Sequence, residues 1–170
     1  IEENIEKLNQ SLAGGVAPAM ATPIHRETGQ IDLDVVPQLV DFLITRGVQG
    51  LFVGGTTGEG ILLDLEPRKK LHEAAVAAAN GRVPVLVHAG GLRTETAVEL
   101  AHHAAEIGAD AMAAVTPIFY GIHEDALADY FQAIAGAAPQ VPFFAYDIPH
   151  MAVNGVSPDL ARRLFEKLPS

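Results

Sequence analysis

The chain has 170 residues, 49% of them hydrophobic, and no cysteine, which predicts one domain around a single core and excludes disulfide bonds and thiolate chemistry. Its formal net charge of −10 at pH 7 disfavours nucleic acid and anionic membrane surfaces as partners. No apolar run reaches the roughly 18 to 20 residues of a membrane-spanning helix, and the first residues, IEENIEKLNQSL, do not resemble a signal peptide, so we expect a cytoplasmic protein.

In chain order, the pattern predicts a short leading helix over residues 1–12 and then five strands that alternate with five helices. The predicted strands are continuously apolar, which is typical of parallel strands buried on both faces, and they comprise residues 15–21, 51–53, 84–88, 110–115 and 141–146. The predicted helices run from a cap at Asp32 to Gly47, from Glu66 to about Gly81, from a capping box at Thr96 and Glu99 to about Gly108, from Glu124 to Ala138, and onward from Ser157.

Five strand-helix units of roughly thirty residues each require a parallel sheet with right-handed crossovers. Two α/β architectures satisfy this pattern: part of a (β/α)8 TIM-type barrel and an open flavodoxin-like sheet. No linker divides the chain, so we expect a single domain over residues 1–170. In both architectures, ligands bind at the C-terminal ends of the strands, and the residues that follow each predicted strand are therefore the candidate site.

The segment GGTTGEG, Gly54–Gly60, follows the predicted strand 51–53. It lacks the lysine of a phosphate-binding loop and the spacing of a dinucleotide fingerprint, so no nucleotide cofactor is predicted. Two adjacent threonine hydroxyls and exposed glycine amides suit a small carboxylate, which needs several short donors around its two oxygens. A purely structural role, in which the glycines allow a tight turn and the threonines cap it, explains the same residues equally well.

Several motifs at predicted strand and helix ends occur in a characteristic order: Thr22-Pro23, Gly55-Thr56-Thr57-Gly58-Glu59, Thr94-Glu95-Thr96, Val115-Thr116-Pro117 and Tyr146-Asp147-Ile148-Pro149. With this order and spacing, nearly the whole chain resembles the dihydrodipicolinate synthase/N-acetylneuraminate lyase family. The resemblance implies the first five βα units of a (β/α)8 barrel. It also implies an enzyme that needs no cofactor and forms a Schiff base between a lysine and a 2-oxo acid such as pyruvate.

The resemblance further implies roles for individual residues. Thr56 and Thr57, with Gly55 and Gly58, would bind the carboxylate of the oxo acid. Thr57 would also take part in a proton relay, and Tyr146 would be the phenol that transfers protons at the reacting centre.

Three features depart from the family pattern. The family's Schiff-base lysine lies at the end of the sixth strand, before which this chain stops; the lysines present all fall on predicted helices, at Lys7, Lys69, Lys70 and Lys167. Met151 stands where the synthase branch commonly carries an arginine, which favours a sugar-acid or other oxo-acid aldolase. Phe119 stands where the family usually has a catalytic tyrosine, so Tyr120 could supply that hydroxyl only if the loop shifts by one residue.

We therefore expect a lyase of the class I aldolase type whose chain, as far as residue 170, is inactive without the lysine. One alternative is a non-catalytic partial barrel that self-associates as a homo-oligomer through its exposed sheet edges. Another is a module that binds a 2-oxo acid without covalent chemistry.

Two histidines follow predicted strands where the family motif has none. His88 and His150 are candidates for a general base or, with Glu59 and Asp147, for a metal site. No metal-binding spacing supports the second reading, so no metal is predicted. Glu59 is also a candidate for fixing its loop through hydrogen bonds to backbone N–H groups.

Overall fold

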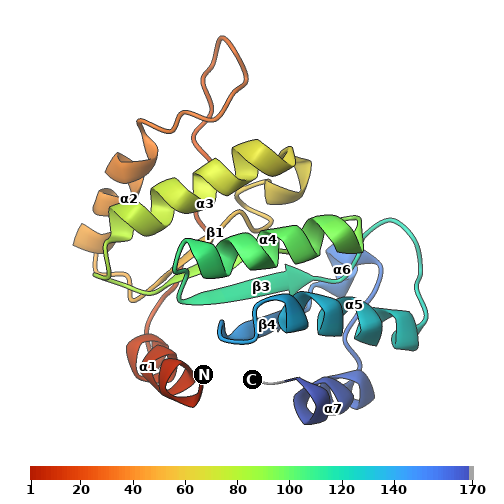
Figure 1. Ribbon diagram of the computed structural model, residues 1–170. Coiled ribbons are helices and arrows are strands. Elements are labelled where there is room, and N and C mark those ends of the chain that lie inside the picture. Colours follow the sequence, from red (N-terminus) through yellow and green to blue (C-terminus); the bar gives the residue numbers. More distant parts are fainter. Residues whose placement is uncertain (169–170) are drawn as a thin grey trace.

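The computed structural model describes residues 1–168 and shows one parallel sheet flanked by helices (Figure 1). The strands are β1 (Leu51–Val53), β2 (Val85–His88), β3 (Ala111–Val115) and β4 (Phe143–Tyr146). The helices are α1 (Glu2–Leu12), α2 (Val36–Thr45), α3 (Leu65–Ala79), α4 (Thr94–Glu106), α5 (Glu124–Ala137), α6 (Pro149–Ala152) and α7 (Pro158–Lys167), with a 3-10 helix η1 (Gly60–Leu62). In this described part of the chain, no helix is long and apolar enough to cross a membrane.

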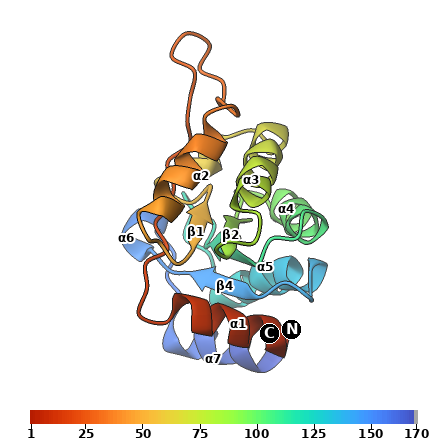
Figure 2. The same ribbon diagram turned by 90° about the vertical axis from the view of Figure 1, so that its left-hand side faces the viewer.

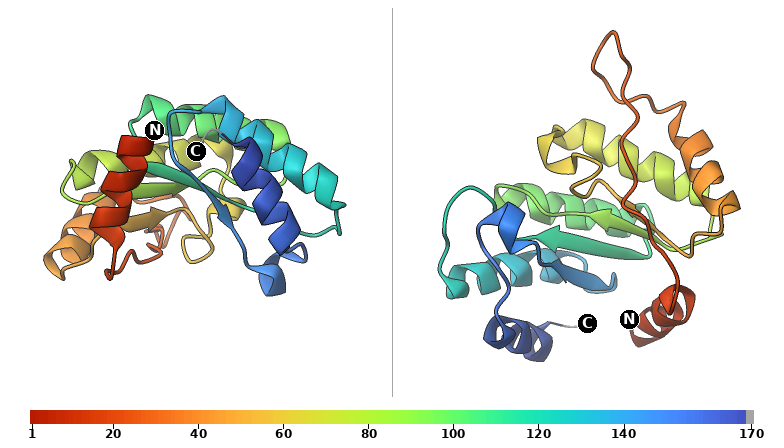
Figure 3. Two further views of the ribbon diagram at one scale, coloured as in Figure 1. Left: turned by 90° about the horizontal axis from the view of Figure 1, so that it is seen from below. Right: turned by 180° about the vertical axis from the view of Figure 1, so that it is seen from behind.

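The strands follow one another in the sheet in chain order, β1-β2-β3-β4, and every pair is parallel. Helices α3, α4 and α5, coloured yellow-green to cyan, form an arc over one side of the sheet (Figure 3, left). A flavodoxin-like sheet would instead reverse its strand order and carry helices on both faces. The arrangement is therefore that of a partial barrel.

Alternate residues of the strands pack on opposite sides of the sheet, as the two-residue period of a strand requires. Val53, Val87 and Met112 belong to the main core beneath the outer helices. On the other side, Leu86 and Ala111 form a small cluster with Leu8 of α1, against which Leu12 and Phe52 also pack. Helix α1 thus packs against the sheet on the side opposite the main core, and Figure 2 shows it below β4.

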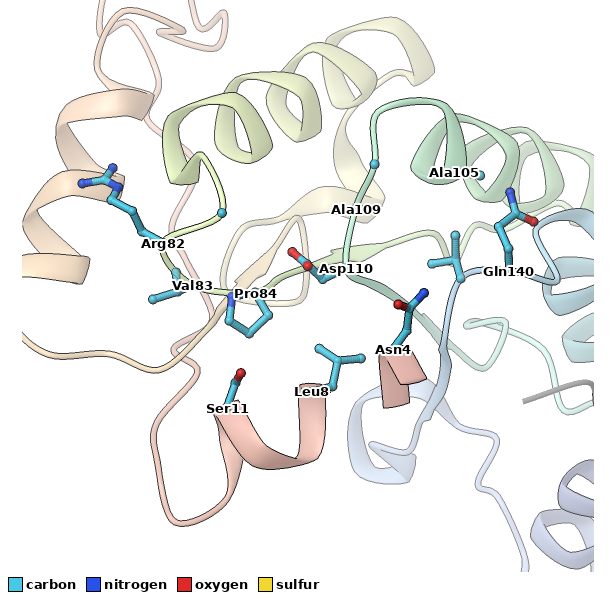
Figure 4. Close-up of a pocket in the computed structure, with 13 residues that line it drawn as sticks. Asn4, Leu8, Ser11, Arg82, Val83, Pro84, Ala105, Ala109, Asp110 and Gln140 are labelled. Atoms are coloured by element: carbon cyan, nitrogen blue, oxygen red, sulfur yellow. The ribbon is translucent and has the colours of Figure 1, made fainter. Parts of the chain in front are cut away.

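A cavity of about 380 Å³ lies between α1 and the segments that precede β2, β3 and β4 (Figure 4). Leu8 and Ser11 of α1 line it, together with Pro84 and Asp110. The Asp110 carboxylate already accepts a hydrogen bond from the Val85 N–H at 2.9 Å. The cavity is at the N-terminal ends of the strands and holds none of the candidate site residues.

The prediction of five strands is wrong for residues 15–21. This segment runs beside β1 with ladder-type hydrogen bonds, such as Met20 N–H to Phe52 O at 2.8 Å, but it forms only the isolated parallel bridge between Ala19 and Phe52. Pro18 accepts from Phe52 N–H and has no N–H to donate, which limits a regular ladder.

Two predicted helix starts are also wrong. Helix α2 begins at Val36 rather than next to Asp32, because residues 33–35 form a turn first. Helix α4 begins at Thr94, so Thr96 lies inside its first turn and does not cap it. By contrast, the predicted cap of the last helix is confirmed, since Ser157 Oγ accepts from Leu160 N–H at 3.0 Å.

Candidate active site

The C-terminal ends of β1 and β4 bring together two of the predicted site residues. Thr56 Oγ1 lies 3.3 Å from the Tyr146 hydroxyl, a hydrogen bond between residues 90 positions apart. Tyr146 ends β4, and its ring packs edge-on against Phe52 of β1 at 5.4 Å and against His88 of β2 at 6.1 Å between ring centroids. Three strands therefore contribute one aromatic cluster directly beneath the GGTTGEG segment.

The GGTTGEG backbone is tightly packed from below. A side chain on Gly58 would approach Met20 O to 2.8 Å, and one on Gly55 would approach the Phe52 ring to 2.6 Å. The Thr22 hydroxyl donates to Gly58 O at 2.5 Å and so ties the loop to the segment before α2. Because the loop is held from below, its threonine side chains project outward, and both are exposed.

A cavity of about 250 Å³ opens beside this loop. Its polar side chains are Thr56, Glu59 and His88. The rest of its lining is glycine or apolar: Gly55, Ile61, Leu62, Val115, Ile118, Ile148 and Met151. A small cavity with few polar groups on an apolar wall is typical of sites for small organic ligands. Met151, at the position where the synthase branch has an arginine, contributes to the apolar wall.

His88 is buried at the end of β2 and contacts Arg68 of α3. Arg68 Nη2 lies 2.7 Å from His88 Nδ1, and Val115 N–H faces His88 Nε2 at 3.1 Å. Arg68 and the Val115 N–H are both donors, and a neutral imidazole accepts through only one nitrogen, so only one of these two contacts is a hydrogen bond in either tautomer. Burial, followed by the nearby Arg68 charge, lowers the pKa of His88 to about 3. His88 is therefore neutral at pH 7 and is too weak a base to act as the predicted proton acceptor.

Three predicted site residues are not joined to the Thr56–Tyr146 pair. The Thr57 hydroxyl makes no hydrogen bond with any described residue. Tyr120 is 72% exposed and packs edge-on against Phe119, whose φ of 88° places it in the left-handed region. His150 lies exposed on α6, although its neighbour Met151 lines the cavity.

The structure supports neither the metal-site interpretation of the histidines and carboxylates nor the loop-fixing role of the Glu59 side chain. Within residues 1–168, no three histidine, aspartate or glutamate side chains are grouped to hold a metal ion, so His88, His150, Glu59 and Asp147 form no ligand cluster. The Glu59 side chain makes no hydrogen bond within the described residues either; its backbone, at φ 52°, donates to Thr56 O and accepts from Leu62 N–H.

All four lysines lie in helices, in α1, α3 and α7. Lys69 Nζ lies 2.6 Å from Glu99 and 3.5 Å from Glu66. These contacts, with the Glu99 hydrogen bond foremost, raise the pKa of Lys69 and keep it protonated. A protonated, ion-paired amine is not a nucleophile.

Sequence reasoning did not single out Arg68 or Asn154, although both are buried polar residues near the site. Arg68 shares the three- and four-residue spacing of the buried residues Leu71 and Ala75. Asn154 is 6% exposed and joins the loop after β3 to the segment after α6. Its side-chain amide donates to Pro117 O and Tyr120 O and accepts from Ile122 N–H, at 2.6 to 2.8 Å.

The sequence profile of the Dihydrodipicolinate synthetase family matches residues 12–170. Rat (Rattus norvegicus) N-acetylneuraminate lyase is 38% identical over 160 residues, which cover 92% of this chain and 50% of the relative. The solved catalytic lysine mutant of Ruminococcus gnavus sialic acid aldolase superposes with a TM-score of 0.88 at 34% identity, covering 91% of this chain and 50% of that one.

A second solved structure is that of YagE from Escherichia coli K12, a prophage protein of the dihydrodipicolinic acid synthase family in complex with pyruvate. It superposes with a TM-score of 0.85 at 32% identity, covering 91% of this chain and 51% of that one. The chain thus spans about half the length of the relatives it matches. The match of the family profile over residues 12–170, together with these structural superpositions, shows that the chain belongs to the dihydrodipicolinate synthetase family.

Proposed function

We propose that this chain forms the oxo-acid-binding part of a lyase or aldolase that acts on pyruvate or a related 2-oxo acid. The observation that carries the proposal is the 3.3 Å contact between Thr56 Oγ1 and the Tyr146 hydroxyl beside the 250 Å³ cavity. The binding of pyruvate by YagE, which shares this fold, supports the choice of ligand.

The chemistry of the pair suits an oxo acid. The Thr56 hydroxyl and the amides of the glycine-rich loop are short donors for a carboxylate. The Tyr146 hydroxyl both donates and accepts, so with Thr56 it forms a two-step path along which a proton can pass to or from a bound ligand. Thr57 is exposed beside Thr56, where its hydroxyl is free to donate to the same carboxylate.

The cavity wall favours an aldolase over an enzyme of the synthase branch. Ile118, Ile148 and Met151 line the cavity beyond the loop, and the lining formed by the described residues contains no arginine or lysine. A second carboxylate on the partner substrate would find no bidentate guanidinium there. We infer that the second substrate is an aldehyde without such a carboxylate, as in the cleavage and formation of sugar acids.

Binding of pyruvate, measured by ligand-observed NMR, tests the proposal. We expect weak reversible binding that Thr56→Val and Tyr146→Phe both reduce. Thr45→Val is the matched control, because the Thr45 hydroxyl donates to Phe42 O within α2, away from the loop. Unchanged binding in folded Thr56→Val protein would show that the loop is not the carboxylate site.

Covalent chemistry is tested separately by intact mass after incubation with pyruvate and borohydride, which reduces a Schiff base to a stable adduct. Because the lysines lie in helices and Lys69 is ion-paired, we expect no adduct on this chain. A stoichiometric adduct would instead show that one of these lysines reaches the site and would make the 170-residue chain an enzyme candidate in its own right.

A second candidate function is that of a partial barrel that self-associates without turnover. Exposed apolar side chains on the β4 side of the sheet favour it. Phe144 of β4 is 43% exposed and Phe165 of α7 is 83% exposed. Exposed apolar side chains beside a sheet edge promote association. A monomer by light scattering at micromolar concentration would contradict this candidate.

A further inference from the structure

The proposed carboxylate site has an electrostatic difficulty. The chain carries a formal charge of −10, and Glu59, an acidic residue, lines the cavity. Among the described residues that line the cavity, none is a lysine or an arginine. Hydroxyls and amides supply hydrogen bonds, but they do not offset the repulsion between a carboxylate ligand and nearby negative charge. A cation close behind the lining would do so.

Arg68 is that cation. It is 2% exposed, and its guanidinium donates to Gly90 O at 2.8 Å and to His88 O, at the end of β2. It also contacts His88 Nδ1 at 2.7 Å, and His88 itself lines the cavity. The charge of Arg68 is therefore separated from the cavity by a single imidazole ring.

The same guanidinium lies next to the start of the GGTTGEG loop. A side chain placed on Gly54 would lie 3.9 Å from Arg68 Nε and 2.9 Å from His72 Nε2. Arg68 Nε is buried without a hydrogen-bond partner in the described residues. Arg68 thus stands behind both walls of the site, the loop and the end of β2.

The groups around Arg68 leave its charge uncompensated. No ion pair formed within residues 1–168 includes Arg68. Burial lowers the pKa of His72 and of His88, and burial raises the pKa of Tyr130, so all three are neutral at pH 7. Burial also lowers the pKa of Arg68, to about 10, which leaves it protonated at pH 7.

We propose that Arg68 is the specificity-determining residue that makes the site prefer anionic oxo acids over uncharged analogues, without touching the ligand. The inference rests on the proposed oxo-acid function and adds to it the source of charge selectivity. If the carboxylate binds on the far side of the His88 ring, at an assumed distance of about 8 Å, a unit charge at an effective dielectric constant of about 20 to 40 changes its affinity roughly 5- to 30-fold. An uncharged ligand of the same shape gains nothing from this charge.

The test compares pyruvate with pyruvamide, its uncharged amide, by ligand-observed NMR titration. The quantity measured is the Kd of pyruvamide divided by the Kd of pyruvate. We expect Arg68→Gln to lower this ratio roughly 5- to 30-fold, mainly by weakening pyruvate, and Arg68→Lys to keep most of it. Arg93→Gln is the matched control, because the Arg93 side chain is 80% exposed at the start of α4 and its removal should leave the ratio unchanged.

Several outcomes would overturn the inference. An unchanged ratio in Arg68→Gln would show that the charge does not act at the site. If both ligands are then weakened equally, the role of Arg68 is limited to holding the end of β2. If wild-type protein binds neither ligand, the proposed function itself fails, and the inference fails with it.

If Arg68→Gln does not fold, a salt titration of the wild-type protein tests whether a buried charge or surface charges produce the ratio. A buried charge is poorly screened, so we expect the ratio to change less than about twofold between about 0.05 M and about 0.5 M NaCl. Loss of the ratio over that range would assign it to surface charges instead.

Discussion

Protonation of the buried histidines should make the protein sensitive to mild acid. His88 titrates near 6.5 when unfolded, but burial and the Arg68 charge lower its pKa to about 3 in the folded state. Between these pH values the unfolded chain binds about one more proton, so the free energy of unfolding falls as the pH falls. From pH 7 to about pH 5 this linkage removes about 2 kcal/mol for His88 alone. His72, whose pKa burial also lowers, adds to the loss in the same direction.

The measurement is a denaturant titration of wild type and His88→Gln at both pH values. Glutamine cannot take up the proton, so we expect wild type to lose about 2 kcal/mol more than the variant over this interval. The absolute stabilities at pH 7 do not enter the comparison. His150→Asn, at an exposed histidine, is the control and should lose as much as wild type. Equal losses in wild type and His88→Gln would refute the assignment of His88 as a buried neutral group.

Three other substitutions test the packing around the site. Asn154→Leu should lower the free energy of unfolding by about 2 to 4 kcal/mol in denaturant titrations, because it leaves several buried backbone groups without a hydrogen-bond partner. It should also speed hydrogen exchange at Ile122 N–H, and unchanged exchange would contradict the contact. Gly60→Ala should destabilise by about 3 kcal/mol or more, or prevent folding, because the new Cβ would lie within 2 Å of Gly54 O; near-wild-type stability would mean a different loop path. Gly136→Ala, with open space around it in α5, should raise stability by about 0.5 to 1 kcal/mol in thermal melts, and a loss would contradict the helix.

The sequence predicted the main elements where one signal dominated. Strands β2 and β3 are short apolar runs buried between parallel neighbours, and α7 carries a serine cap followed by proline. Strand β4 forms where it is predicted, but it is the last strand of the sheet and its residues are half-buried or exposed, so the expected burial on both faces is wrong for it. Residues 15–21 are equally apolar, but apolarity reports burial and not ladder hydrogen bonding, which Pro18 limits. The start of α4 was misplaced because Thr96 and Glu99 have capping-box spacing at a position where the chain is already helical.

The sequence predicted the side chains that meet at the site better than the buried residues that hold them in place. Parallel strands end at one edge of a sheet, which places Thr56 and Tyr146 at the same edge. Because β1 and β4 are the outermost of the four strands, the curvature of a barrel is also needed to bring the two hydroxyls within 3.3 Å. The partners of Asn154 lie more than thirty positions away in the chain, so no local pattern indicated its role. Arg68 was hidden by its residue type, because an arginine beside glutamate and two lysines on a helix ordinarily faces water.

The Phe52 ring limits which residue can occupy position 55, three residues further along the chain. The Phe52 ring occupies the space that any side chain at position 55 would need, at 2.6 Å from an added Cβ. The same ring packs against Tyr146 and His88, so it cannot turn aside without disturbing them. A library randomised at positions 52 and 55 and selected for folding should therefore yield covarying pairs: glycine with an aromatic residue, or alanine with a smaller aliphatic one.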